Sequence, residues 1–243
     1  MVRIMEYRDA LEYLKTTKSI GIMLGLDRVK RLLDILGNPQ DRLKIIHVAG
    51  TNGKGSICTF LEAMYMAEGK KVGRYISPTI HTYLERFQIN GVHMTEEMFA
   101  KLLSKIVPVV EQMEAEGLEL PTAFEIETAI AFLYFAVEKA DIIILETGMG
   151  GREDATNVVA KPLCTVFASI GMDHMQFLGD TVERITLEKA GIMRDNCPVV
   201  SYPNTSKVCD VLIQQAGLHK VSPFVVNKED IKILSENLEG SRF

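Results

Sequence analysis

Hydrophobic residues occur along this chain in two alternating patterns. Short apolar runs, which suit the buried strands of a parallel sheet, are separated by segments whose apolar residues recur at helical spacing. We expect a strand that begins at Ile45, and further strands at 71–76, 141–146, 165–170, 198–201 and 223–226. We expect a helix pair over 7–36, joined by residues 16–25, with Asp27 as the cap of the second helix. Further helices are expected near 57–66, 98–113, 122–139, 181–189 and 207–216. This order predicts an α/β fold, a mainly parallel sheet with helices on both faces.

A glycine-rich turn with one lysine follows the first strand. Its sequence is Gly50-Thr51-Asn52-Gly53-Lys54-Gly55-Ser56, and a helical pattern begins directly after it. Glycines let backbone N–H groups turn inward, and the helix start adds unpaired donors, so the loop is suited to a polyphosphate. Lys54 supplies a mobile cation and Ser56 a hydroxyl for Mg²⁺. The loop departs from the ordinary P-loop, because Val48 replaces the first glycine and Gly55 separates Lys54 from Ser56. The alternative is a glycine-rich hairpin turn.

Polar residues also stand just past three later strands. Ser77 follows the second strand, Glu146 ends the strand at 141–146, and His174 follows the strand at 165–170. Ligands of open α/β sheets bind beyond the carboxyl ends of the strands, so we expect these residues beside the glycine-rich loop. A carboxylate at the end of an apolar strand requires a partner, and Mg²⁺ on ATP phosphates is one. Ser77 also fits a turn hydroxyl, and His174 a hydrogen-bonded structural residue.

Three further features have a structural and a functional interpretation. Thr122 and Glu125 have the spacing of a capping box, which explains both residues without a ligand, and Phe124 between them is explained as a core residue just as easily. Glu85 and Arg86 lie in a loop of the kind that covers ligands, yet they equally fit an ordinary surface pair. The connection at 16–25 is apolar, so it either packs on the main domain or lines a pocket for a flat ligand.

Composition narrows the class of protein. With 243 residues and 47% hydrophobic content, the chain can bury a substantial core in one large domain or two small ones. Its net charge of −5 argues against general nucleic-acid binding, and its apolar runs are too short to span a membrane. The cysteines are scattered, which suits reduced thiols and a cytoplasmic protein. They are Cys58, Cys164, Cys197 and Cys209.

Four separated stretches resemble the folylpolyglutamate synthases of the Mur ligase superfamily. They are residues 50–56, Ser77-Pro78 with 85–91, residues 145–157, and Asp173-His174 with 188–192. Their order and separation cover nearly the whole chain. The resemblance implies a P-loop-type central ATP-binding domain over residues 1–243, with a helical segment at 1–40.

The activity implied by this resemblance is an ATP-dependent amide ligase. It phosphorylates a folate carboxylate, and the amino group of L-glutamate then attacks the acyl phosphate. The implied ATP-binding residues are Gly50, Thr51, Asn52, Gly53, Lys54, Gly55 and Ser56, and the implied Mg²⁺ ligands are Ser77, Glu146 and His174. The implied catalytic residues are Lys54, His174 and Lys189, of which Lys189 matches a lysine that carries a carbamate. The pterin end of the substrate is implied near Gly21, Ile22, Met23, Leu24, Thr122, Ala123, Phe124, Glu125, Glu153, Asp154 and Ala155.

Two departures from the family pattern limit the assignment. Met23 stands where relatives that also make dihydrofolate tend to carry an aspartate, so dihydrofolate synthase activity is less supported than glutamate addition. Family members continue into a second α/β domain that binds glutamate, so the resemblance implies a further domain in cis. Weak or absent turnover is therefore expected from residues 1–243 alone.

Two alternatives to the folate ligase stay open. The first is a Mur-type cell-wall amino-acid ligase, against which the Thr122–Glu125 turn and the run at 150–157 count. The second is a catalytically incomplete nucleotide-binding module.

Overall fold

The computed structural model describes residues 4–18, 21, 23–227, 229, 231–238 and 240–242. Its helices are α1 (Tyr7–Lys18), α2 (Asp27–Ile35), α3 (Lys54–Ala67), α4 (Glu96–Ala115), α5 (Ala123–Val137), α6 (Met175–Leu178), α7 (Val182–Ala190) and α8 (Ser206–Leu218). Short 3₁₀ helices are η1 (Pro39–Arg42), η2 (Tyr83–Arg86) and η3 (Ala155–Val158). The strands are β1 (Ile45–Ala49), β2 (Val72–Tyr75), β3 (Phe87–Ile89), β4 (Val92–His93), β5 (Ile142–Glu146), β6 (Cys164–Phe167), β7 (Val199–Ser201), β8 (Phe224–Val225), β9 (Ser235–Asn237) and β10 (Gly240–Arg242). The predicted α/β class is confirmed.

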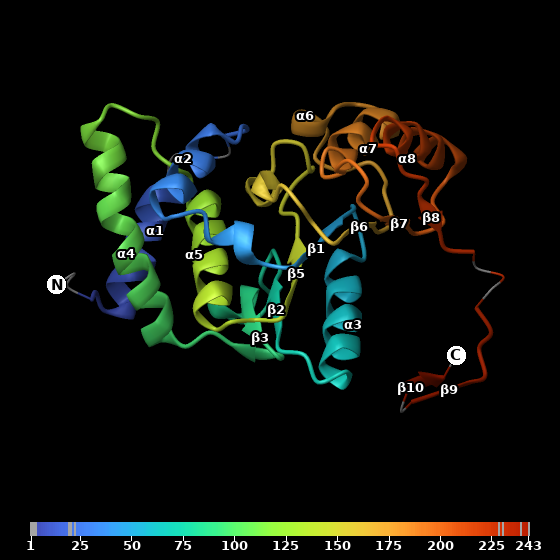
Figure 1. The fold of residues 1–243 in the computed structure, drawn as a ribbon, viewed down its shortest axis with the longest axis horizontal. Helices are drawn as coiled ribbons and strands as arrows, with labels where there is room; N and C mark the ends of the chain where they lie inside the picture. Colours follow the sequence, from blue (N-terminus) through green and yellow to red (C-terminus); the bar gives the residue numbers. More distant parts are fainter. Residues whose placement is uncertain are drawn as a thin grey trace.

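Within the described residues, eight strands form one sheet in the order β4-β3-β2-β5-β1-β6-β7-β8. From β2 to β8 the neighbours are parallel, whereas β3 and β4 form an antiparallel edge. β1 lies at the centre, and the chain leaves it toward β2 on one side and reaches β6 on the other (Figure 1). The carboxyl ends of β1, β2, β5 and β6 therefore meet at one edge, at the position where ligands of such sheets bind.

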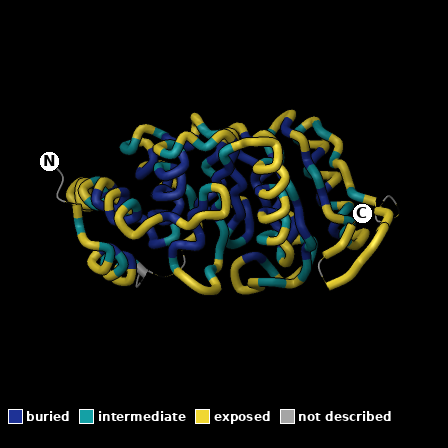
Figure 2. Tube along the Cα trace, turned by 90° about the horizontal axis from the view of Figure 1, so that it is seen from below, coloured by how far each residue is buried: buried dark blue, intermediate teal, exposed yellow. Residues whose placement is uncertain are grey.

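The strand side chains alternate between two helical layers, as a period of two requires. Ile45 of β1 joins the core of α4 and α5, whereas Ile46 and Val48 join the core under α3. Ala49 and Phe167 lie on the same face of the sheet as Ile45 and pack with α7 and α8. Figure 2 shows the resulting buried centre with exposed helix surfaces around it. Both faces of the sheet are thus covered, which explains the uninterrupted burial of β1 and β5.

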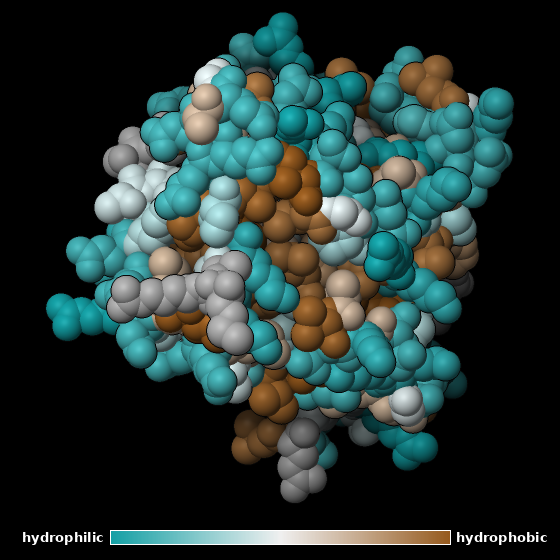
Figure 3. Space-filling view, turned by 60° about the vertical axis from the view of Figure 1, so that its left-hand side comes forward, coloured by the Kyte–Doolittle hydropathy of each residue, from teal (hydrophilic) through white to brown (hydrophobic). Residues whose placement is uncertain are grey.

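The N-terminal helices share a core with the sheet domain. Ala10 and Leu14 of α1 and Leu32 and Leu33 of α2 are buried in the same cluster as residues of α4 and α5. The connection at 16–25 is described at 16–18, 21 and 23–25, and Met23 is 42% exposed. Figure 3, which brings this side of the molecule forward, shows hydrophobic side chains exposed between hydrophilic ones. β9 and β10 form a separate two-stranded sheet, and the residues of both strands are exposed.

The structure corrects three local expectations. Asp27 does not cap α2, because Leu26 occupies the cap position and Asp27 lies in the first turn. Helix α3 begins at Lys54 rather than near residue 57, because Gly53 adopts a φ of 85° at its N-cap and lets the backbone enter the helix there. Glu85 and Arg86 are not a surface pair, since both are buried and each binds other partners.

Buried His47 in β1 makes the fold sensitive to acid. Its Nε2 lies 2.8 Å from Thr156 Oγ1, and burial, followed by the charge of Arg194, lowers its pKa to about 3. An unfolded chain takes up this proton near pH 6.5, so the native state loses stability as the pH falls from about 6.5 toward 3, by on the order of 5 kcal/mol in total. Urea unfolding at pH 7.5, 5.5 and 4.5 measures the slope.

The matched variants for this prediction are His47→Gln and His93→Gln. We expect H47Q to flatten the dependence of unfolding free energy on pH below 6.5, whereas H93Q at an exposed position retains it. The assignment to His47 is wrong if H47Q keeps the slope of the unmodified chain.

Within the described part of the chain, no helix combines the length and apolar content required to cross a membrane.

Candidate functional site

The glycine-rich loop is held between the ends of β1 and β6. Gly50 has a φ of 156° and packs so closely that an added Cβ would lie 2.7 Å from Cβ of Ala168. Thr51 donates its backbone N–H to the Ser169 carbonyl at 2.7 Å, and its hydroxyl bonds the Gly171 backbone. The strand, loop and helix succession predicted for residues 45–67 is confirmed, and a hairpin turn is excluded. The start of α3 consequently presents its free N–H groups beside the loop.

Lys54 reaches from the first turn of α3 back across the loop. Its Nζ donates to the Gly50 carbonyl at 3.1 Å and to the Thr51 carbonyl at 3.4 Å. The same nitrogen lies 3.8 Å from Oε1 of Glu146, so the cation and the carboxylate predicted from separate parts of the sequence lie side by side. This juxtaposition places one positive and one negative group at the edge of the sheet.

Glu146 ends β5 and is 4% exposed. Burial raises its pKa to about 7, while the Lys54 charge and a hydrogen bond from the Ser77 backbone act in the opposite direction. The groups around Glu146 therefore only partly compensate its charged form for the loss of water. A cation beside this carboxylate would stabilise the charged form further. The backbone at Gly55 passes close to this carboxylate, because an added Cβ would lie in van der Waals contact with Oε2, at 3.7 Å.

Lys189 also contacts the glycine-rich loop. It lies in the last turn of α7, is 2% exposed and donates to the Gly50 carbonyl at 2.9 Å. Burial, followed by the positive charge of Lys54, lowers its pKa to about 8. Gly151 allows this approach, since an added Cβ would lie 2.6 Å from the Lys189 carbonyl oxygen. The two lysines predicted as catalytic thus meet at one carbonyl.

Ser77 and His174 line one cavity at this edge. His174 adopts a φ of 45°, its side chain is half exposed, and Nε2 lies 3.5 Å from Oδ1 of Asp173. The described residues hold no group of three or more His, Cys, Asp and Glu side chains arranged as a metal site. One hydroxyl, one carboxylate and one imidazole fit Mg²⁺ nonetheless, because this ion usually keeps waters and substrate phosphates as ligands. The buried Glu146 carboxylate is the observation that favours a cation here.

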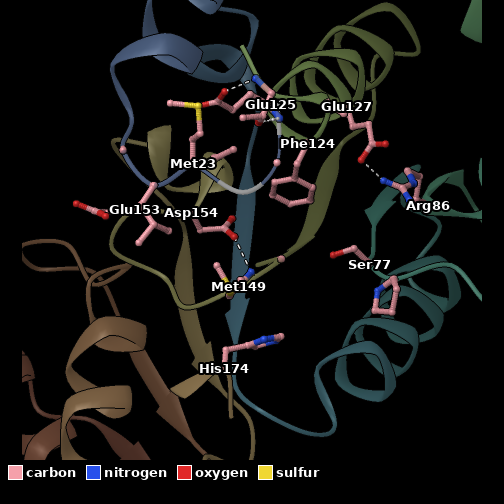
Figure 4. Close-up of a pocket in the computed structure, with 18 residues that line it drawn as sticks. Met23, Ser77, Arg86, Phe124, Glu125, Glu127, Met149, Glu153, Asp154 and His174 are labelled. Atoms are coloured by element: carbon pink, nitrogen blue, oxygen red, sulfur yellow. Dashed lines mark hydrogen bonds and ion pairs between the residues drawn. The ribbon is translucent and has the colours of Figure 1, made fainter. Parts of the chain in front are cut away.

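The cavity has a volume of about 700 Å³ and extends from the sheet edge to the N-terminal helices (Figure 4). Its walls include every described member of the set predicted to bind the substrate. These are Gly21, Met23, Leu24, Thr122, Ala123, Phe124, Glu125, Glu153, Asp154 and Ala155. Ile22 lies outside the described residues. The structure brings these residues together, whereas their binding of a substrate stays a prediction.

Phe124 forms a wall of the cavity and also packs against the hydrophobic core. Its ring lies between Met23 and Ser77 in the view of Figure 4, and packs on Tyr75 with a centroid distance of 6.2 Å. Gly148 allows the ring to pack closely on the backbone, because an added Cβ would lie 2.5 Å from the ring. The cavity is therefore shaped to accept a flat ligand against an aromatic face.

The capping box predicted for α5 is present, and it also shapes the cavity. The Thr122 hydroxyl accepts from the Glu125 backbone at 3.3 Å, and Glu125 Oε2 accepts from the Thr122 backbone at 2.6 Å. Asp154 is similarly fixed, because it accepts from the backbones of Met149 and Thr156 at 2.8 and 3.0 Å. These two carboxylates are held rigidly by the chain itself.

Sequence reasoning missed Glu127 and the role of Arg86. Both line the cavity, and the Arg86 guanidinium donates to the Glu127 carboxylate, which also accepts the Tyr83 hydroxyl at 2.5 Å. The sequence does contain one clue to this pair, because Glu127 is a charged residue within an apolar run of a helix expected to be buried. Its partner was not predictable from spacing.

The parallel sheet, the glycine-rich loop and the charged groups at its edge define an α/β domain of the P-loop type. Residues 90–241 match the family model of the Mur ligase middle domain. This chain belongs to the Mur ligase family.

Several named proteins are similar to this chain in sequence or in structure. The dihydrofolate synthase/folylpolyglutamate synthase of Bacillus subtilis is 43% identical over 219 residues, which is 90% of this chain and 50% of that protein. The folylpolyglutamate synthase of Thermotoga maritima superposes with a TM-score of 0.87 at 34% identity, over 97% of this chain and 54% of that one. A folylpolyglutamate synthase complex with AMPPCP and folate gives a TM-score of 0.87 at 28% identity, over 98% of this chain and 60% of that one. The chain thus spans about half the length of the curated relatives it matches.

Proposed function

We propose that this chain is the ATP-binding part of a ligase that adds L-glutamate to a folate through an acyl phosphate. The observation that carries the proposal is the position of Lys54 and Glu146, 3.8 Å apart, at the edge where a cavity with an aromatic wall opens. A relative of similar fold is named as a complex with AMPPCP and folate, which supports a nucleotide and a pterin as the two ligands.

In this proposal the loop at 50–56 binds the triphosphate, and Lys54 stabilises the charge that moves during phosphoryl transfer. Ser77, Glu146 and His174 would hold Mg²⁺, which when bound supplies Lewis-acid neutralisation of phosphate charge. The folate carboxylate is a poor acylating group until phosphate is attached, and no side-chain nucleophile is required.

Lys189 has the surroundings expected of a lysine that is converted to a carbamate. Its neutral nitrogen attacks carbon dioxide, forms an N–C bond and releases a proton, which replaces a cation by an anion. The depressed pKa supports this, because it raises the fraction of neutral amine. We further propose a reducing, cytoplasmic compartment, which is supported by the free thiols of all four cysteines.

Calorimetry with AMPPCP, Mg²⁺ and a reduced folate tests the proposal, followed by an assay of ADP release on addition of glutamate. We expect both ligands to bind, with weak or absent turnover from residues 1–243 alone. Nucleotide binding without folate binding would contradict the folate ligase and favour the nucleotide-binding module.

The variant Phe124→Ala should lower the affinity for folate by about tenfold or more, because it removes the aromatic face. The affinity for AMPPCP should be unchanged. Phe60→Ala is the matched control, since Phe60 is 63% exposed on α3. Equal folate affinity in F124A and F60A would show that the ligand does not contact this wall.

A further inference from the structure

Arg28 of α2 is a buried arginine that sequence reasoning did not single out. It is 7% exposed and does not itself line the cavity. Nη2 donates to the carbonyl oxygens of Met23 at 3.0 Å and Leu24 at 3.4 Å. Nε donates to Glu125 Oε2 at 3.2 Å, and Nη1 to Glu119 Oε2 at 3.1 Å. One guanidinium therefore joins the loop before α2 to the segment that leads into α5.

Three of these four contacts reach walls of the cavity. Met23 and Leu24 line it on one side, and Glu125 lines it at the start of α5. Glu125 uses Oε2 for both Arg28 and the Thr122 backbone, and it is 3% exposed. Its other oxygen, Oε1, is buried and has no hydrogen-bond partner among the described residues. Arg28 thus sets the direction in which a buried carboxylate offers its remaining acceptor.

The contacts of Arg28 differ in how firmly they hold the guanidinium in place. The ion pair with Glu119 lies at the surface, because the Glu119 side chain is 72% exposed, so water and salt weaken it. The bond to Glu125 is buried at both ends. The bonds to Met23 and Leu24 use the fixed fork of a guanidinium, which a lysine ammonium cannot reproduce while also reaching a carboxylate.

We propose that Arg28 is a positioning residue of the substrate cavity, which fixes the Met23–Leu24 wall and the Glu125 carboxylate relative to each other. Arg28 then controls affinity for the ligand in the cavity without touching it, and leaves the nucleotide loop unaffected. The inference rests on the proposed function, because that function identifies the cavity ligand as a folate.

The test compares Arg28→Lys and Arg28→Met with Arg31→Ala, a neighbouring arginine on α2 whose ion pairs are exposed. We expect R28K and R28M to weaken folate binding by about tenfold or more, as displaced supporting residues do, with the AMPPCP affinity unchanged within twofold. R31A should bind both ligands like the unmodified chain. R28K keeps a charge beside Glu125, so it provides a folded variant if R28M unfolds.

A second readout needs no ligand. Hydrogen exchange of the backbone amides at residues 23–27 and 122–126 should be faster in R28K than in the unmodified chain, whereas exchange at residues 50–56 should be the same. Unchanged exchange in R28K would overturn the positioning role, and so would an equal loss of affinity for folate and AMPPCP. If the unmodified chain binds no folate, the proposed function fails instead, and the exchange result alone supports or overturns the role of Arg28.

Discussion

The variant Lys54→Ala is expected to bind ATP about a hundredfold more weakly than the unmodified chain. Lys54 is a cation in reach of the loop, and charge-assisted hydrogen bonds to phosphate contribute up to ~3 kcal/mol, which is about a hundredfold in affinity. Its loss also leaves Glu146 without its nearest positive group. Calorimetric titration with AMPPCP and Mg²⁺ measures the effect.

The matched control is Lys101→Ala, which removes an exposed lysine of α4 and should leave nucleotide affinity unchanged. Circular dichroism and the thermal midpoint show whether K54A remains folded. If folded K54A bound AMPPCP as tightly as K101A, the loop at 50–56 would not be the phosphate site.

Replacing Arg86 by methionine should lower the free energy of unfolding by about 3–5 kcal/mol, the cost of leaving a buried charge without its partner. Both Arg86 and Glu127 are less than a tenth exposed, and the Glu127 carboxylate accepts from Arg86 and from the Tyr83 hydroxyl. Loss of the guanidinium leaves that carboxylate in an apolar helix. Urea unfolding at neutral pH, followed by circular dichroism, gives the change.

Arg184→Met is the comparison for this variant. Its ion pair with Asp180 is 70% and 72% exposed, so the expected change is below about 1 kcal/mol. The double variant Arg86→Met with Glu127→Leu should regain part of the loss, because neither charge then remains buried. A single R86M variant as stable as R184M would contradict this account of the buried pair.

Much of the fold followed from local patterns. The apolar run of β5 predicted a strand buried on both faces, and the glycines around Lys54 predicted a loop between a strand and a helix. These signals are local because backbone geometry depends on neighbouring residues, so glycine positions and side-chain period carry them directly. The predicted helix bounds differ from the observed ones by a few residues where one glycine decides the start of a helix, as Gly53 does for α3.

The strand pattern predicted those residues of the candidate site that stand at the ends of strands. Ser77 and His174 follow a strand and Glu146 ends one, and parallel strands deliver such residues to one edge. The substrate set came from family resemblance, and the structure brings its described members to one cavity. The sequence did not decide the positions of Phe124, Glu85 and Arg86, because the same local sequence fits an exposed and a buried side chain.

The sequence by itself therefore determined the order of elements, the glycine-rich loop and the edge at which chemistry-bearing residues collect. Tertiary structure alone decided which distant side chains meet. Arg28 contacts Glu125 across 97 positions, and Lys189 contacts Gly50 across 139. No periodicity encodes such a pair, because it exists once helices have packed on the sheet and water has been excluded. The same exclusion gives Glu146, Lys189 and His47 their shifted pKa values, since desolvation acts on a side chain through its burial.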